Sequence, residues 1–288
     1  MTSLLSKGII LSTVALIAVG CGGAERKEKK QESKKQVITQ KGSDTMILLG
    51  QQWAEKFGAA NPDIQVQVTG GGSGTGISSL INGTTDLCNS SRPMKAQEKE
   101  QIKQKFGADP VEIPVAKDAL SIYVNDASKI ESLTLEQLYG IYTGKIANWN
   151  QVGGGDAKII LYGRENSSGT YEYFKDHVLK KEDFAPETQT LSGTAAVVNA
   201  VSKDPNGIGY GGAAFSKGIR EVKVAGPDGN PVPPTKENVY AGTYPLARDL
   251  YIYLHEQPTG GIKQYIDWIL GPEGQAVVTN VGYYPIKQ

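Results

Sequence analysis

Three short segments of the chain are rich in glycine, serine and threonine. They are residues 42–45 (GSDT), residues 70–76 (GGGSGTG) and residues 164–170 (RENSSGT). Ser and Thr hydroxyls are neutral hydrogen donors, and Gly lets backbone N–H groups approach a ligand closely. Arg164 adds a planar, permanently charged fork of donors that suits a tetrahedral oxyanion. Together these groups predict the capture of an anion by about ten hydrogen-bond donors, without a metal ion.

Each segment stands between a predicted strand and a predicted helix. Strand-like residues 37–40, 64–68 and 159–162 precede the three segments, and apolar residues at helical spacing follow them. The first turn of a helix has unpaired N–H groups and the positive end of the helix dipole, so it attracts anions. Three helix starts that meet at one point would therefore form an anion site.

Taken alone, each segment also has an ordinary structural interpretation. Ser and Thr are common helix N-caps, Gly-rich turns are frequent, and a lone Arg such as Arg164 often forms a surface ion pair. The combination favours a shared site, because all three segments fall within residues 42–170 and one places Arg164 four residues before Ser168.

The rest of the chain continues the alternation of strands and helices. Strands are predicted at 37–39, 64–68, 111–115, 120–124 and 159–162. Helices are predicted at 46–57, 76–82, 95–106, 134–142, 169–178 and 261–270, with another after Pro272 and a surface loop at 226–234. Repeated strand–loop–helix units indicate an α/β fold with largely parallel sheets.

The first 35 residues are predicted to contain a targeting signal followed by a tether. Lys7 precedes a mostly apolar run that ends in AVGC, a pattern typical of a signal peptide and similar to a bacterial lipobox. Residues 1–20 are therefore expected to be the signal peptide, and Cys21 is expected to be lipidated, with palmitate. An ordinary secretory signal in which Cys21 is incidental is the alternative. Residues 21–35 are too charged to bury a core, so they are expected to form a tether.

The composition excludes several classes of function. Thirty Lys and Arg balance 30 Asp and Glu among 288 residues, so the chain is neither a basic nucleic-acid binder nor an acidic disordered tail. With two Cys and two His, neither a disulfide framework nor a zinc site is expected, and no metal or cofactor is predicted. From residue 36 onward 23 basic residues face 27 acidic ones, a net charge of −4, so local geometry must hold any anion.

No catalytic motif assembles in the sequence. His177 and His255 are far apart, and neither lies in an acid–base or nucleophile motif. Residues 70–76 match neither the G-x-S-x-G elbow nor the G-x-G-x-x-G dinucleotide fingerprint. We therefore expect a binding protein and not an enzyme, with a phosphate-ester hydrolase as the rival hypothesis.

Motifs spread over the chain after the signal resemble those of one family. KGSDTM, GGGSGTG, RENSSGT, LTLEQLYGIYTGKIANWNQV (133–152), DPNGIGYGG (204–212) and YPLARDLYIY (244–253) are similar to the phosphate-binding lipoproteins of bacterial ABC-type phosphate uptake systems. The resemblance implies a two-lobed, type II periplasmic-binding-protein-like fold that closes on inorganic phosphate in the cleft between its lobes. The phosphate-binding residues that it implies are Ser43, Thr45, Ser73, Arg164, Ser168, Gly169 and Thr170.

Position 91 departs from part of that family. Some members have an Asp there, whose carboxylate accepts the proton of phosphate and helps to reject sulfate. This chain has Ser91 followed by Arg92, as in another branch of the family. The resemblance implies that Ser91 is the phosphate-binding residue at this position. Its selectivity for phosphate over sulfate is expected to be weaker than that of Asp, because a hydroxyl can donate a hydrogen bond as well as accept one. Asp44 or Glu172 could be the proton acceptor instead, and Arg92 could be either a second charge on the anion or a partner of Glu172.

The implied fold also divides the chain. Lobe I would contain residues 36–117 and 247–288, lobe II would contain residues 118–246, and two crossing strands would form the hinge. The expected protein is a monomeric receptor, anchored to the membrane through Cys21 on its extracytoplasmic side. It would deliver phosphate to the permease subunits of an ABC importer. Sulfate or molybdate bound by the same architecture is the closer alternative.

Overall fold

The computed structural model describes residues 35–286, and these belong to one compact unit. The expected signal peptide, Cys21 and the tether up to residue 34 lie outside the described residues. Within residues 35–286, no helix combines the length and the apolar character that a membrane crossing requires.

Strands and helices alternate along most of the described chain. The strands are β1 (Gln36–Gly42), β2 (Ile64–Thr69), β3 (Leu87–Ser90), β4 (Val111–Val124), β5 (Ser132–Thr134), β6 (Ile160–Arg164), β7 (Gln189–Leu191), β8 (Gly207–Gly212), β9 (Arg220–Ala225), β10 (Pro231–Val232) and β11 (Ala247–Leu254). The helices are α1 (Ile47–Ala60), α2 (Ser73–Asn82), α3 (Ala96–Phe106), α4 (Leu135–Tyr142), α5 (Gly169–His177), α6 (Thr194–Lys203), α7 (Lys236–Ala241), α8 (Gly260–Leu270) and α9 (Pro272–Val281). Short 3₁₀ helices occupy Asp44–Met46, Trp149–Val152 and Ala213–Phe215.

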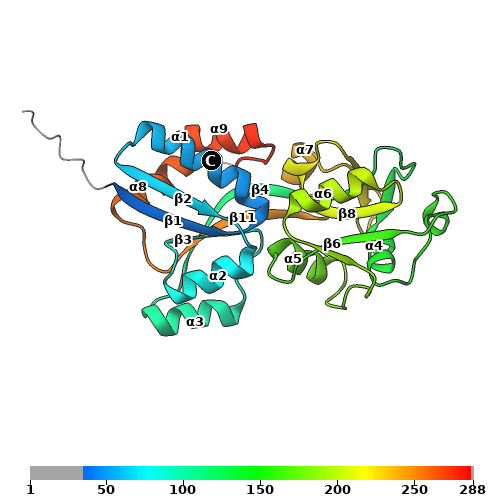
Figure 1. Ribbon diagram of the computed structural model, residues 1–288, viewed down its shortest axis with the longest axis horizontal. Coiled ribbons are helices and arrows are strands. Elements are labelled where there is room, and N and C mark those ends of the chain that lie inside the picture. The colour runs from blue at the N-terminus through cyan, green and yellow to red at the C-terminus, as the bar shows by residue number, and fades with distance from the viewer. Residues whose placement is uncertain (1–34, 287–288) are drawn as a thin grey trace, which may run out of the picture. The chain divides into compact units, whose positions relative to one another are not determined.

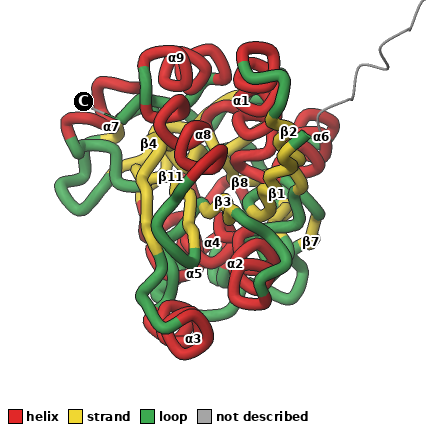
Figure 2. The backbone as a smooth tube through the Cα atoms, turned by 90° about the vertical axis from the view of Figure 1, so that its left-hand side faces the viewer, coloured by secondary structure: helices red, strands yellow, loops and turns green. Residues whose placement is uncertain are grey.

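The first half of the sheet contains β1, β2, β3 and β11. β2 and β3 flank β1 in parallel, and β11 pairs with β3 in the antiparallel sense. In β2 the partly buried Ile64, Val66 and Val68 alternate with exposed polar residues, so one face of the strand packs inward. Helices α1, α8 and α9 lie on one face of this half and α2 and α3 on the other, each group over its own apolar cluster (Figures 1 and 2).

The second half contains β6, β7, β8 and β9. β6 pairs in parallel with β7 and β8, and β9 pairs with β4 in the antiparallel sense. A separate core fills this half, in which the rings of Phe174 and Tyr210 stack with their centroids 4.2 Å apart. Phe174 belongs to α5, so this stack fixes α5 against the sheet.

Two antiparallel strands, β4 and β11, connect the halves. Residues 111–119 of β4 pair with β11, whereas residues 120–124 of the same strand pair with β8. Figure 1 shows both strands running from the half that carries α1 to the half that carries α6. Each core is therefore joined to the other by continuous β-structure.

The α/β class is confirmed, but the prediction of largely parallel sheets is wrong. Half of the pairings between strands are antiparallel. Four of these involve β4 or β11, which run between the two halves instead of returning through crossover helices, and the fifth is the pairing of β10 with β9. The stretches at 111–115 and 120–124, expected separately, form the single strand β4. Part of the expected loop at 226–234 forms β10, which pairs with β9.

Candidate functional site

Four side-chain hydroxyls, on Thr45, Ser73, Ser91 and Thr170, meet at one point, and we call them the hydroxyl cluster. The Thr45 and Thr170 Oγ1 atoms are 2.8 Å apart, and the Ser73 and Ser91 Oγ atoms are 3.4 Å apart. Ser91 Oγ lies 3.5 Å from Thr170 Oγ1, and none of the four residues is more than 1% exposed. The structure thus brings residues of all three Gly/Ser/Thr segments together with Ser91.

The hydroxyl cluster lies where helices begin. Thr45 is in the 3₁₀ turn that leads into α1, Ser73 is the first residue of α2, and Thr170 is the second residue of α5. First-turn N–H groups lack intrahelical acceptors, and the helix dipoles put partial positive charge at these ends. The arrangement therefore offers hydroxyl donors and the positive ends of helix dipoles to an anion, although the Gly74, Thr170 and Tyr171 N–H groups already have acceptors.

Two glycines allow the helix starts of α2 and α5 to approach each other. A Cβ atom on Gly169 would lie 2.3 Å from Ser73 Oγ and 2.9 Å from Ser91 Oγ. A Cβ atom on Gly72 would lie 2.4 Å from the Ser167 carbonyl oxygen, and Gly72 has a φ of +90°. Larger residues at these positions would force the two helix ends apart.

Backbone bonds hold the first segment in place. Ser43, predicted as a ligand, precedes the 3₁₀ turn, is 3% exposed, and donates its N–H to the Asn89 carbonyl over 2.9 Å. The Gly72 N–H donates to the Gly42 carbonyl over 3.0 Å. From the C-terminal part of the chain, Tyr283 donates its hydroxyl hydrogen to the Thr45 carbonyl over 2.6 Å. The loop before Thr45 and the Thr45 carbonyl are thereby both held in place.

Ser168 is the N-cap of α5. Its Oγ accepts hydrogen bonds from the backbone N–H groups of Thr170, at 3.2 Å, and Tyr171, at 3.3 Å. The ordinary capping role that the sequence allowed is therefore present. Both bonds use lone pairs, so the Ser168 hydroxyl hydrogen stays available for a ligand.

The Arg164 guanidinium is buried among polar partners. Its side chain is 1% exposed and contacts Glu165 through Nε at 3.1 Å and Nη2 at 2.9 Å. Nη2 also lies 3.1 Å from Asp44 Oδ2, and Nη1 donates to Thr194 Oγ1 over 2.8 Å. Burial opposes ionisation of Glu165, but the hydrogen bonds and charge of Arg164 outweigh it and lower the pKa of that carboxyl. Arg164 is thus held by two carboxylates.

Asp44 links the first two segments to Arg164. Its Oδ1 accepts the Gly71 N–H over 2.9 Å while its Oδ2 contacts the guanidinium. A Cβ atom on Gly70 would lie 2.2 Å from Asp44 Oδ1, so the backbone of the second segment passes directly over this carboxylate.

Arg92 and Glu172, both predicted near the site, form an ion pair. Arg92 Nε lies 2.5 Å from Glu172 Oε2, and the other two guanidinium nitrogens contact Glu98 at 2.8 and 2.7 Å. Lys95 Nζ adds a contact of 2.9 Å to Glu172 Oε1. Of the two interpretations of Arg92 that the sequence allowed, the structure displays the pairing with Glu172.

Two charged residues that the sequence motifs did not single out, Asp118 on β4 and Arg248 on β11, lie beside the hydroxyl cluster. Arg248 Nη2 lies 3.1 Å from Thr170 Oγ1 and 2.8 Å from Asp118 Oδ2. Burial raises the pKa of the fully buried Asp118 carboxyl, and Arg248 opposes this rise only in part. The signal for Arg248 was present in the motif YPLARDLYIY, but its strand lies 78 residues from Thr170, so no local pattern joins them.

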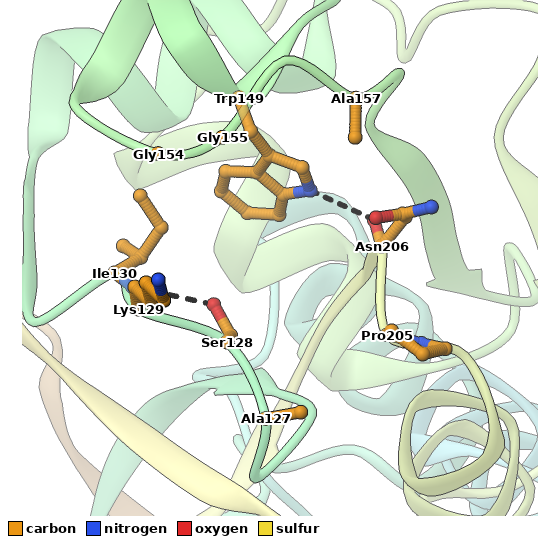
Figure 3. Close-up of a pocket in the computed structure, with 10 residues that line it drawn as sticks. All are labelled: Ala127, Ser128, Lys129, Ile130, Trp149, Gly154, Gly155, Ala157, Pro205 and Asn206. Carbon is orange, nitrogen blue, oxygen red and sulfur yellow. Dashed lines mark hydrogen bonds between the residues drawn. The ribbon is translucent and has the colours of Figure 1, made fainter.

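Among the described residues, neither a metal site nor the pocket around Trp149 enlarges the candidate site. No group of three or more His, Cys, Asp or Glu side chains within residues 35–286 could hold a metal ion. A pocket of about 250 Å³ lies around Trp149 and residues 127–130 (Figure 3). None of the predicted site residues lines this pocket, and its Trp149 Nε1 already donates to the Asn206 carbonyl over 3.0 Å.

Comparison with known proteins gives one family. A model of the PBP superfamily domain matches residues 29–273. The phosphate-binding protein PstS of Pseudomonas aeruginosa is 36% identical over 263 residues, which cover 85% of this chain and 81% of the relative. PstS of Bacillus subtilis is 33% identical over 286 residues, covering 96% of this chain and 92% of the relative.

Solved structures agree with the sequence matches. A Clostridium perfringens protein crystallised with bound phosphate superposes with a TM-score of 0.80 at 30% identity, covering 87% of this chain and all of that one. An ABC-type phosphate transport receptor from Vibrio cholerae superposes with a TM-score of 0.71 at 29% identity, over 86% of this chain and all of the receptor.

Proposed function

The chain belongs to the PBP superfamily and, within it, to the phosphate-binding proteins of ABC transporters, and on this premise we propose that it captures inorganic phosphate outside the cytoplasmic membrane for delivery to an ABC importer. The proposal is carried by the meeting of four buried hydroxyls, three at the starts of helical segments and the fourth, that of Ser91, in the loop after β3. This set of donors suits an oxyanion and needs no metal.

In this proposal phosphate takes the place of the contacts within the hydroxyl cluster. Thr45 and Thr170 would exchange their contact with each other, and Ser73 its contact with Ser91, for bonds to phosphate oxygens. Ser43, Ser168 and Gly169 would add donors from the same loops. Each bond to a charged oxygen contributes about 1.5–3 kcal/mol. Arg164 would supply the charge, steadied by Asp44 and Glu165.

Ser91 would face the protonated oxygen of phosphate. The two alternative proton acceptors already have other partners. Asp44 contacts Gly71 and Arg164, whereas Glu172 contacts Arg92 and Lys95. Arg92 would then act on the Ser91 loop and not on the anion. Because a hydroxyl both donates and accepts, rejection of sulfate or molybdate is expected to be incomplete.

We further propose that the chain is a two-lobed monomer. Residues 36–117 and 247–288 would form lobe I, residues 118–246 lobe II, and β4 and β11 the hinge. Contacts between the proposed lobes support this, among them Gly74 N–H to the Ser167 carbonyl at 2.9 Å and Asp44 to Arg164. Phosphate between the lobes would favour the closed form, which permease subunits would recognise.

The N-terminal part completes the proposal. Residues 1–20 would be a signal peptide and Cys21 the lipidated anchor, with residues 21–35 as a tether between membrane and receptor. The extracytoplasmic place of the family supports this assignment. Mass spectrometry of the membrane fraction would detect a lipid-modified Cys21 at the N-terminus, and an unmodified cysteine would contradict the anchor.

Calorimetric titration of the full chain in detergent tests the function. Phosphate is expected to bind at one site per chain, more tightly than sulfate or molybdate. Failure to bind phosphate, or preference for another oxyanion, would contradict the proposal. A phosphomonoester turnover assay on the same sample addresses the rival hypothesis, and sustained release of phosphate would favour a hydrolase.

A further inference from the structure

A buried ion pair lies directly beside the hydroxyl cluster. Asp118 and Arg248 are register partners on the antiparallel strands β4 and β11. Arg248 Nε and Nη2 lie 2.9 and 2.8 Å from the same oxygen, Asp118 Oδ2, while Asp118 Oδ1 accepts the Ala213 N–H over 3.1 Å. Asp118 is 0% and Arg248 6% exposed, so the guanidinium is fixed in one orientation.

The remaining donors of Arg248 contact both sides of the candidate site. Nη1 donates to the Ser91 carbonyl over 3.1 Å, on the side of β3. Nη2 donates to Thr170 Oγ1 over 3.1 Å, at the start of α5. The ring of Tyr173, one turn further along α5, packs 5.3 Å from the guanidinium carbon. One side chain on a connecting strand therefore touches residues from both halves of the sheet.

The chemistry of the guanidinium determines how the Thr170 hydroxyl can act. A guanidinium only donates hydrogen bonds, so Thr170 Oγ1 must be the acceptor in this contact. One lone pair of that oxygen is then occupied. The single hydroxyl hydrogen must turn away from Arg248, toward the side where Thr45 and Ser91 lie. Thr170 is thereby poised to donate to an anion.

We propose that Arg248, held by Asp118, is a positioning residue for phosphate. It orients the Thr170 hydroxyl so that this group donates to the anion, and it holds the loop at Ser91 through the Ser91 carbonyl. This role rests on the proposed function, because it concerns the same site. Arg248 does not itself touch the anion. Asp118 acts only through Arg248, because it fixes the plane of the guanidinium group.

A double-mutant cycle tests the proposal on the full chain in detergent. Arg248→Lys keeps the charge but loses the fork, so its phosphate Kd is expected to rise about tenfold or more. In a Thr170→Val background, which lacks the hydroxyl, the same substitution is expected to raise Kd less than about threefold. A Kd change under twofold in the first background, or equal factors in both, would overturn the proposal.

Arg220→Lys is the matched control. Arg220 also lies on a strand, and its guanidinium donates to the Ser128 carbonyl, away from the hydroxyl cluster. Its Kd is expected to equal that of the unmodified chain. If the unmodified chain binds no phosphate, the proposed function fails; if it binds but the cycle shows no coupling, only the role of Arg248 fails.

If Arg248→Lys does not fold, a crystal structure of the unmodified chain with phosphate tests the positioning role of Arg248 without a substitution. Thr170 Oγ1 is expected within hydrogen-bond distance of both a phosphate oxygen and Arg248 Nη2. Direct contact between Arg248 and phosphate, or a Thr170 hydroxyl turned away from phosphate, would overturn the proposal.

Discussion

At the scale of single residues, the positive charge next to the candidate site belongs to buried arginines with carboxylate partners. Arg164 contacts Asp44 and Glu165, and Arg248 contacts Asp118. Removing one member of such a set leaves its partner buried and unpaired, which costs more than the bond alone contributes. Substitutions at these positions therefore report on both binding and stability, and the two effects have to be measured separately.

Arg164→Ala removes the positive charge proposed to face phosphate. We expect phosphate binding to weaken by about 2–3 kcal/mol, because a charged donor is lost from a desolvated site. Calorimetric titration measures this loss, and Arg220→Ala serves as the control for removal of a strand arginine. An unchanged dissociation constant would refute the assignment of Arg164.

The free energy of unfolding is expected to depend on pH through the Glu165 carboxyl. Its pKa in the folded chain lies below the ordinary value of 4.5, so the ionised form contributes stability above that value. This contribution is lost as the pH falls through the lowered pKa. Unfolding by denaturant should show Glu165→Gln less stable than the parent chain at pH 6, with the difference shrinking below pH 4.5. A difference that grows in acid would contradict this.

At the scale of elements, the site depends on how closely two helix ends approach. Gly169 begins α5 against Ser73 at the start of α2, with no room for a Cβ atom between them. The same glycine also starts the helix that carries Thr170. The packing of α5 against its core, through Phe174, thus sets the position of the Thr170 hydroxyl, on the residue next to the Gly169 contact with α2.

Gly169→Ala tests this close approach. The added methyl group would push α5 from α2, and we expect phosphate affinity to fall at least about tenfold, since hydrogen bonds weaken steeply once their geometry is lost. Gly155→Ala is the matched control, because nothing lies within 4 Å of a Cβ atom there. Equal Kd values for both variants would show that the contact does not matter for binding.

At the scale of the whole molecule, ion pairs connect the two proposed lobes beside the site. Glu172 on α5 contacts Arg92 and Lys95, which follow β3 in the chain. Lys95 is 55% exposed, so its contact is weak, whereas Arg92 is 5% exposed. The Arg92–Glu172 pair is therefore the stronger support for a closed arrangement.

Glu172→Gln is expected to loosen closure. Phosphate should dissociate several-fold faster, with a smaller change in the association rate, because the pair forms after encounter. Stopped-flow tryptophan fluorescence measures both rates. Glu182→Gln breaks the exposed pair with Lys145 and provides the control. A dissociation rate equal to that of the control variant would contradict the role of Glu172.

The local chemistry of this protein can be predicted from neighbouring residues alone. Gly, Ser and Thr placed between strand and helix specify helix starts with free donors, because capping and turn geometry depend on neighbouring residues. The helices at 46–57 and 169–178 and the three Gly/Ser/Thr segments were found on that basis, and α1 and α5 confirm those helices. Whether the proposed residues bind phosphate stays a prediction.

Contacts between residues far apart in the chain depend on how the whole chain folds. Arg248 reaches Asp118 across 130 residues and Thr170 across 78, and no periodicity records such contacts. Two crossing strands were expected from the sequence, but the antiparallel pairing of β4 with β11 was not, because strand direction depends on the path of the whole chain. Burial then fixes the positions of the contacting side chains, because a buried charge that loses its partner destabilises the fold.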